Sequence, residues 1–415
     1  MINQKRLWHR ISELSKVGRQ EKGGVTRFSF TEETKQAKAL VSSFMKEAGL
    51  EVREDTVGNL IGRKEGSRPD AQTVVIGSHI DSVPNGGDFD GPLGVLSGIE
   101  VCQTMNEQGI KTVHPIEVIA FTDEEGSRFG FGMIGSRGFA GTLQQEDLQH
   151  VDEDGVTIRE AMRKDGLDPD KIADSARVGN SIKAYIELHI EQGKVLENHN
   201  LPVGIVSGIA GPVWLKWTLK GEAGHAGATP MDIRRDPVIP AAQIIKYIEE
   251  ETKKYPTAVA TIGKIAVKPG GFNVIPSQIE FSLDLRDIHE DTRDKIEQAI
   301  TSYACQVCKE RDIELEISTL QRVPPSPCSA SIQQSIEEAF VKTGKEIFTL
   351  PSGAGHDGMQ FKDFCPIGMI FVRSQNGISH NPEEWSTEED CKDGANVLYH
   401  TVLQLAGGQT PKSCG

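Results

Sequence analysis

Histidines and carboxylates follow apolar segments at several places in the chain. His79 and Asp81 come at the end of the apolar, β-branched segment 73–78 and lie two residues apart, so both side chains should point to one face of a strand. A histidine held by an aspartate is a common arrangement at metal sites. Asp90 lies in a glycine-rich turn, where glycine lets the backbone direct a carboxylate inward. A structural His–Asp hydrogen bond and a plain Asp-Gly turn are the alternatives.

Three consecutive carboxylates, Asp123, Glu124 and Glu125, follow the apolar segment 115–122. Three carboxylates at the end of a buried strand are costly unless a cation compensates their charge. Because neighbouring side chains diverge, Glu124 and Glu125 can serve different roles. A solvated loop is the alternative interpretation.

Two further histidines complete the set of candidate ligands. Segment 184–191 alternates, with apolar residues on one face and Glu187, His189 and Glu191 on the other, which predicts a half-buried strand with His189 on its polar face. His380 lies in a loop after the strand that contains Phe371. Together these residues supply the nitrogen and oxygen donors that a pair of hydrolytic divalent cations needs.

The elements that carry these residues predict an α/β domain. Segments 73–78 and 115–122 are predominantly apolar, as expected for buried strands of a mainly parallel sheet, and the glycine-rich stretch 86–98 leads into a helix that ends near residue 108. We therefore predict a doubly wound fold, in which sites form at the carboxyl ends of the strands. Segment 151–178 is polar and predicts a peripheral helical excursion.

A second domain is predicted within the first. Its elements are a strand at 213–220, a helix from Asp236-Pro237 to about 254, strands at 257–267 and 278–286, a helix at 290–311 and a strand at 314–320. This order is the ferredoxin-like β-α-β-β-α-β pattern. We place this inserted α+β domain at 210–327. The α/β pattern then resumes with helices at 331–343 and 390–405 and a strand at 368–372, so residues 1–209 and 328–415 form one discontinuous domain.

Charge, hydropathy and cysteine content argue against several classes of protein. The formal net charge is −15, which argues against a nucleic-acid partner. No apolar stretch approaches the roughly 20 residues that span a bilayer, and residues 1–14 lack the apolar core of a signal peptide. Seven scattered cysteines, including the pair Cys305 and Cys308 inside a predicted helix, argue against a disulfide framework. We expect a cytoplasmic enzyme without a membrane partner.

Six motifs resemble the dinuclear M20 metallopeptidase superfamily, and within it the hydantoinase/carbamoylase branch. That branch includes N-carbamoyl-L-amino acid hydrolases, allantoate amidohydrolases and β-ureidopropionases. The resemblance covers essentially the whole chain, with the motifs in the same order. They are Ser78–Asp81, Gly87–Gly91, Asp123–Gly126, Glu187–Gly193, His225–Met231 and Ser379-His380.

The resemblance implies two divalent metal ions per subunit. It assigns His79 and His189 to one ion, Glu125 and His380 to the other, and makes Asp90 the bridge. Zinc, manganese, cobalt and nickel all suit such nitrogen and oxygen ligands.

The resemblance also implies catalytic and substrate-binding residues. Glu124 would be the general base and acid, Asp81 would orient His79, and His225 would stabilise the oxyanion. Arg286 lies on the strand face opposite the apolar residues, and a planar guanidinium suits a carboxylate clamp, although a surface arginine is the alternative. The residues implied for substrate binding are Gln192, His225, Asn273, Arg286, Gly355 and His356.

The expected activity is hydrolysis of the carbamoyl C–N bond of N-carbamoyl-L-amino acids to amino acid, carbon dioxide and ammonia. Allantoate amidohydrolase shares every motif and is the alternative. An aminoacylase or dipeptidase is more distant, because Gln192, Asn273 and Arg286 occur together. The retained Glu124 argues against a silent ureide-binding protein. The resemblance further implies a homodimer formed through the inserted lid and dimerisation domain, with His225 serving the partner's site.

Overall fold

The computed structural model describes residues 1–408. Contacts within the chain divide it into two compact units. The larger unit contains Met1–Ser207, Cys328–Leu350 and the chain from His356 onward. The smaller unit contains Gly208–Pro327 and, in addition, the short segment Pro351–Gly355. Gly355 therefore falls in the smaller unit, although the sequence placed it with residues 328–415.

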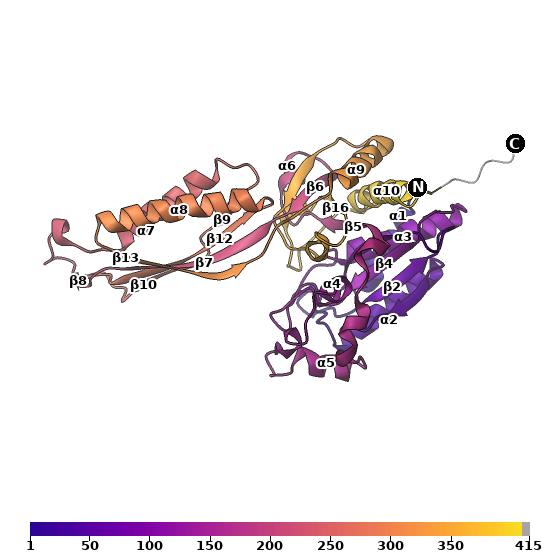
Figure 1. Ribbon diagram of the computed structural model, residues 1–415, viewed down its shortest axis with the longest axis horizontal. Coiled ribbons are helices and arrows are strands. Elements are labelled where there is room, and N and C mark those ends of the chain that lie inside the picture. The colour runs from indigo at the N-terminus through magenta and orange to yellow at the C-terminus, as the bar shows by residue number, and fades with distance from the viewer. Residues whose placement is uncertain (409–415) are drawn as a thin grey trace. The chain divides into compact units, whose positions relative to one another are not determined.

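The larger unit is built around a mixed sheet whose central strands are parallel (Figure 1). The four parallel neighbours, in spatial order, are β4, β3, β5 and β16. Antiparallel strands flank them, β2 and β1 beyond β4, and β6 beyond β16. The bounds are β1 Glu51–Glu54, β2 Leu60–Lys64, β3 Thr73–His79, β4 Ile116–Phe121, β5 Ile182–Ile190, β6 Val203–Ile209 and β16 Ile367–Val372.

Each face of this sheet is covered, and the two faces have different characters. Val74 and Ile76 of β3 belong to a core that includes apolar residues of α1, α2, α3, α9 and α10. The alternate residues, Val75 and His79, point to the other face, where α4 and the 3-10 helix η5 lie next to the sheet. The bounds are α1 Gln4–Leu14, α2 Glu32–Glu47, α3 Pro92–Glu107, α4 Ile134–Ala140, η5 Asp357–Phe361, α9 Ala330–Thr343 and α10 Glu388–Leu405.

Close packing of α3 on the sheet depends on small residues. A Cβ atom at Gly94 would lie 2.3 Å from the carbonyl oxygen of Leu188, and one at Gly98 would lie 2.9 Å from Ile76. Glycine at both positions therefore lets the helix approach the strands. This approach fixes the start of α3, and with it the turn that carries Asp90.

The excursion before β5 has a small core of its own. It contains η1 Asp147–Gln149, α5 Ile158–Lys164 and η2 Pro169–Ser175. Ile158, Met162 and Ile172 are buried there together with Phe30 and Phe129. Segment 151–178 is mainly polar, and most of its apolar residues pack in or against this cluster.

The smaller unit is an antiparallel sheet with two helices, α7 and α8, packed together against it (Figure 1). The spatial order is β10-β12-β7-β13, and β9 also pairs with β12. Alternate residues of β12 are buried with apolar residues of both helices. The bounds are β7 Gly211–Lys220, α7 Val238–Thr252, β9 Val259–Thr261, β10 Ile265–Lys268, β12 Gln278–Asp287, α8 Glu290–Glu310 and β13 Glu314–Arg322, with the short strands β8 Gly224–His225, β11 Val274–Ile275 and β14 Ser326–Pro327. Two further short elements are α6 Val195–Asn198, which belongs to the larger unit, and β15 Thr349–Ser352, which pairs with β6.

Two local predictions are wrong. The single strand predicted at 257–267 is two strands, β9 and β10, and the Lys264 amide between them donates to the Ser282 hydroxyl. The register of pairing with β12 shifts by one residue across this break, as at a β-bulge. Strand β5 is not half-buried, because it lies between β3 and β16 with both faces covered, and Glu187 and His189 are 0% and 1% exposed.

Candidate metal centre and active site

Site residues lie at the carboxyl ends of the four central parallel strands. His79 ends β3, His189 lies in β5, and Glu124 and Glu125 follow β4. His380 lies in the loop between β16 and α10. Asp123, Gln192 and His380 have φ values of 55°, 59° and 54°, a left-handed conformation that is uncommon outside glycine and clusters at functional sites.

Asp90 lies between two groups of candidate ligands, with one carboxylate oxygen toward each. Its Oδ1 is 3.0 Å from His189 Nε2 and 3.7 Å from His79 Nε2. Its Oδ2 is 3.1 Å from His380 Nε2, and that nitrogen is 3.6 Å from Glu125 Oε2. The structure thus brings together all five residues that the sequence proposed as metal ligands, in the two groups in which it proposed them.

The two buried histidines are held with Nε2 free to bind a cation. His79 Nδ1 lies 3.2 Å from the main-chain oxygen of Asp81, and His189 Nδ1 lies 2.9 Å from that of Ile190. A carbonyl accepts from an N–H, so the neutral rings carry their proton on Nδ1 and present a lone pair at Nε2. The Asp81 carboxylate accepts the amides of Glu124 and Glu125 at 3.3 and 3.2 Å. Asp81 therefore positions these two residues as well as His79.

These residues fit a divalent cation chemically. His189 Nε2 is buried and forms no hydrogen bond within the described residues, although Asp90 Oδ1 is only 3.0 Å away. A lone pair facing a carboxylate is unfavourable unless a proton or a cation lies between them. Imidazole nitrogens and carboxylate oxygens are the donors that zinc and related ions bind.

The electrostatics of the cluster show the same need for positive charge. Burial raises the pKa of Glu125 to about 7 and holds that of Glu124 well above its usual range. Burial also acts to raise the pKa of Asp90, but the neighbouring imidazole rings of His189, His380 and His79 hold it well below the usual range. The hydrogen bond to Asp90 raises the pKa of His380 to about 9. Bound cations would stabilise these carboxylates in their charged form.

Metal removal should leave the fold intact but make its stability depend on pH. Folding raises the pKa of Glu125 and Glu384 to about 7, of Asp357 to about 8 and of His380 to about 9. In each case the folded state holds its proton more tightly than the unfolded state, so stability is lost as pH rises through these values. We expect the Tm of chelated protein to fall between pH 6 and pH 9, with native circular dichroism at pH 6. Loss of that signal on chelation at pH 6 would contradict this.

The substrate residues predicted in the smaller unit form two groups. His225 in β8 pairs with Val274 in β11, and the Asn273 carbonyl accepts the Ala226 amide. His225 Nδ1 accepts the amides of Gly227 and Ala228 at 3.1 and 3.2 Å. In the neutral ring the proton is then on Nε2, which makes the exposed His225 a hydrogen-bond donor.

Arg286 is already engaged in this structure. Its Nε and Nη2 donate to the two carboxylate oxygens of Asp284 at 2.9 and 2.7 Å, and its Nη1 donates to the Gly353 carbonyl at 2.6 Å. The guanidinium is thus held beside the loop that includes Gly355. A substrate carboxylate would have to share or displace Asp284.

Two predicted substrate residues lie in the larger unit, beside the cluster. The side-chain amide of Gln192 donates through Nε2 to Asp90 Oδ2 at 2.8 Å. The His356 ring is 2% exposed and its centroid is 4.5 Å from that of His189. Burial and the neighbouring His189 hold the pKa of His356 well below its usual range. A neutral ring at this position is therefore a polar group that needs no counter-ion.

The sequence prediction missed buried residues that support these side chains. Glu187 accepts hydrogen bonds from Ser78 at 3.0 Å and Tyr185 at 2.8 Å. Glu384 accepts the Asp90 amide at 3.1 Å. Glu187 begins one of the motifs and Glu384 follows the motif Ser379-His380 in the same loop, but nothing in their spacing distinguishes a supporting carboxylate from a surface one.

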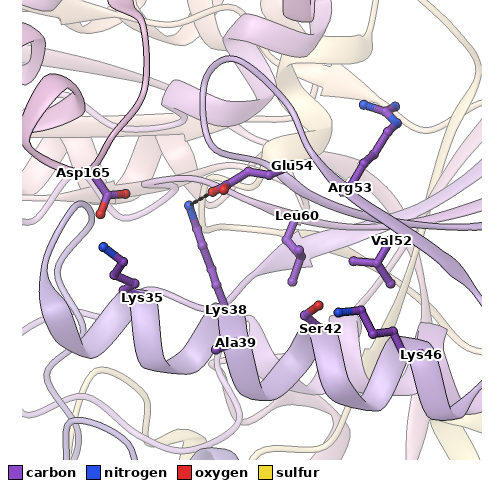
Figure 2. Close-up of a pocket in the computed structure, with 10 residues that line it drawn as sticks. All are labelled: Lys35, Lys38, Ala39, Ser42, Lys46, Val52, Arg53, Glu54, Leu60 and Asp165. Atoms are coloured by element: carbon purple, nitrogen blue, oxygen red, sulfur yellow. Dashed lines mark hydrogen bonds and ion pairs between the residues drawn. The ribbon is translucent and has the colours of Figure 1, made fainter.

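A separate pocket of about 320 Å³ lies between α2 and β1 (Figure 2). Its wall carries four basic residues, one of which, Lys38, forms an ion pair with Glu54 at 2.8 Å. It includes none of the site residues predicted from the sequence. The lining residues are Lys35, Lys38, Ala39, Ser42, Lys46, Val52, Arg53, Glu54, Leu60 and Asp165.

Comparisons with known proteins show what this chain is similar to. Residues 75–404 match the model of peptidase family M20/M25/M40. An N-carbamoyl-L-amino acid amidohydrolase of Geobacillus stearothermophilus is 59% identical, over 99% of this chain and 100% of its own length. Allantoate amidohydrolase of Bacillus subtilis is 34% identical, over 95% and 96%. A crystal structure of an amidase of the hydantoinase/carbamoylase family from Burkholderia multivorans has a TM-score of 0.92 at 37% identity, covering 98% of both chains. Within residues 1–408, no helix is long and apolar enough to cross a membrane.

Proposed function

Because the chain belongs to the M20/M25/M40 peptidase family, we propose that it is a two-metal amidohydrolase that cleaves the carbamoyl C–N bond of N-carbamoyl-L-amino acids. The observation that carries this proposal is the placement of Asp90, with one oxygen toward His79 and His189 and the other toward His380. A relative with 59% identity bears the name of this activity.

Glu124 is the residue proposed to move protons. Its Oε2 is 3.7 Å from His79 Nε2, so the carboxylate lies beside the proposed ligands. Two divalent cations held by His79, His189, Asp90, Glu125 and His380 would lower the pKa of a water molecule and polarise the carbamoyl oxygen. Glu124 takes a proton as the water oxygen bonds to the carbamoyl carbon, and His225 Nε2 donates to the resulting oxyanion.

The second half of the reaction returns that proton. As the C–N bond to the amino acid breaks, the leaving nitrogen takes the bonding electron pair and a proton from Glu124. The amino acid leaves as a free amine, and the remaining carbamate decomposes to carbon dioxide and ammonia. One water molecule is consumed, and Glu124 is ready for another cycle.

Allantoate is the second candidate substrate, because a relative with 34% identity bears the name allantoate amidohydrolase. A substrate panel distinguishes the two candidates. Purified protein loaded in turn with zinc, manganese, cobalt or nickel would be assayed with N-carbamoyl-L-amino acids, N-carbamoyl-β-alanine and allantoate. We expect the highest kcat/KM for an N-carbamoyl-L-amino acid. A higher value for allantoate would establish the alternative, and hydrolysis of dipeptides alone would overturn both.

Arg286 is proposed to bind the substrate carboxylate. Replacing it with alanine should raise KM by on the order of 10²-fold, because a charge-assisted bidentate pair is lost. Arg286→Lys keeps the positive charge but loses the planar guanidinium that can bind both carboxylate oxygens. Its KM should therefore lie between those of wild type and Arg286→Ala. The matched control is the substrate amide. If wild type and Arg286→Ala discriminate acid from amide equally, the clamp lies elsewhere.

The active unit is proposed to be a homodimer in which His225 serves the partner's site. Mixing two inactive variants, Glu124→Gln and His225→Ala, should then restore activity. With random subunit exchange half of the dimers are mixed, and each mixed dimer has one complete site, so roughly a quarter of all sites recover. If His225 acts within its own chain, no complete site forms. No recovery after exchange has been verified with a tag would contradict the proposal.

A further inference from the structure

We propose that Glu384 is a positioning residue that fixes Asp90 and ties the turn of Asp90 to the loop of His380. Its Oε1 accepts the main-chain amides of Phe89 and Asp90 at 2.9 and 3.1 Å. Its Oε2 accepts the Ser379 hydroxyl at 2.9 Å. One carboxylate therefore holds two segments that are almost 300 residues apart in sequence.

Ser379 extends this link to the side chain of Asp90. Its hydroxyl lies 2.9 Å from Asp90 Oδ2, the same oxygen that faces His380. Asp90 is thus held through its amide by Glu384, and its carboxylate shares the single Ser379 hydroxyl proton with Glu384 Oε2. Because His380 follows Ser379 directly, a change in Glu384 should alter both residues at once.

The surroundings of Glu384 show that the contact is built into the fold. The residue is 4% exposed. A Cβ atom at Gly87 would lie 2.1 Å from Glu384 Cδ and Oε1, so only glycine leaves room for the carboxylate. The rings of Trp8, Phe89 and Trp385 pack together next to it, with centroids 5.4 to 5.8 Å apart. Glu384 is therefore buried, and its carboxylate is held in a fixed position.

The inference rests on the proposed metal centre but concerns metal binding rather than turnover. Residues that support a metal ligand change metal affinity or activity by about 10- to 100-fold when replaced. We expect Glu384→Ala to weaken binding of Zn²⁺ within that range. Glu384→Gln keeps an oxygen for the two amides and should stay within a few-fold of wild type.

The experiment titrates Zn²⁺ into chelator-treated full-length protein in competition with a chromophoric chelator. Glu383→Ala is the matched control, since Glu383 is the exposed neighbour. Gly87→Ala is a second test, because its Cβ should displace Glu384 without removing it. If both variants act through one contact, their effects on the dissociation constant will not add in the double variant.

The outcomes separate the inference from the proposed function. Weaker Zn²⁺ binding by Glu384→Ala or Gly87→Ala, with Glu383→Ala at the wild-type value, supports a positioning role. Equal Zn²⁺ affinity in wild type and both variants overturns it, even if the variants have a lower Tm. Should Glu384→Ala fail to fold, Gly87→Ala decides. If wild type binds Zn²⁺ but hydrolyses no carbamoyl substrate, only the proposed function fails. If wild type binds none of Zn²⁺, Mn²⁺, Co²⁺ and Ni²⁺ in the same titration, both fail.

Discussion

Replacing Glu124 with glutamine should lower kcat by about 10³-fold or more, because a positioned general base and acid contributes on that order. Glutamine has nearly the same size as glutamate, and its amide nitrogen and oxygen cannot take up a proton at neutral pH. The main-chain amide of residue 124 would still donate to Asp81, so the backbone at the site should be unchanged. Bound metal, measured by atomic emission, should stay at the wild-type level.

Glu125→Gln is the matched comparison, since this neighbour lies 3.6 Å from His380 Nε2 and is proposed as a ligand. It should lose metal as well as activity. If the activity of Glu124→Gln is within tenfold of that of wild type, Glu124 is not the general base. A Glu124→Gln protein that had lost its metal would show that this residue is a ligand instead.

Asp90→Asn should weaken metal binding by more than about 100-fold, the upper end of the effect for residues that merely support a ligand. Among residues 1–408, Asp90 is the only carboxylate that lies within 4 Å of all three proposed histidine ligands, and asparagine offers one weaker oxygen donor in place of two charged ones. We expect bound metal to fall from two ions to one or fewer per chain, with turnover lost.

Asp88→Asn is the matched control for that experiment. Asp88 is two residues away in the same turn, but its carboxylate pairs with the exposed Arg19 at 2.9 Å. It should keep both its metal and its activity. An Asp90→Asn protein that retained two ions would contradict the bridging role.

Much of the candidate site could be predicted because its residues lie where strands end. His79 is the last residue of one apolar strand and Glu124 and Glu125 follow another, and parallel strands bring their carboxyl ends to one edge of a sheet. The positions of these residues at strand ends were therefore enough to predict that their side chains lie close together. The same reasoning gave the order of strands and helices in the smaller unit, where apolar alternation in β12 is regular.

Other features depend on tertiary contacts that periodicity does not record. Alternation in β5 suggested a solvated face, but Glu187 and His189 are buried because the second face is covered as well. Strands β1, β2 and β6 were not predicted, and of these only β1 is short, charged and mostly exposed. The pairing of Arg286 with Asp284, two residues earlier on the same strand face, could have been read from the period of two. The contact of Glu384 with Phe89 and Asp90 could not have been predicted from periodicity, because almost 300 residues separate the partners in sequence.

The most direct test of the account is a metal titration followed by turnover. Chelator-treated protein would receive increasing equivalents of a divalent cation while release of ammonia from an N-carbamoyl-L-amino acid is recorded. We predict no release without metal and a rise that reaches its plateau at two equivalents per chain. Full activity in the metal-free protein, or a plateau at one equivalent, would contradict a two-metal hydrolase.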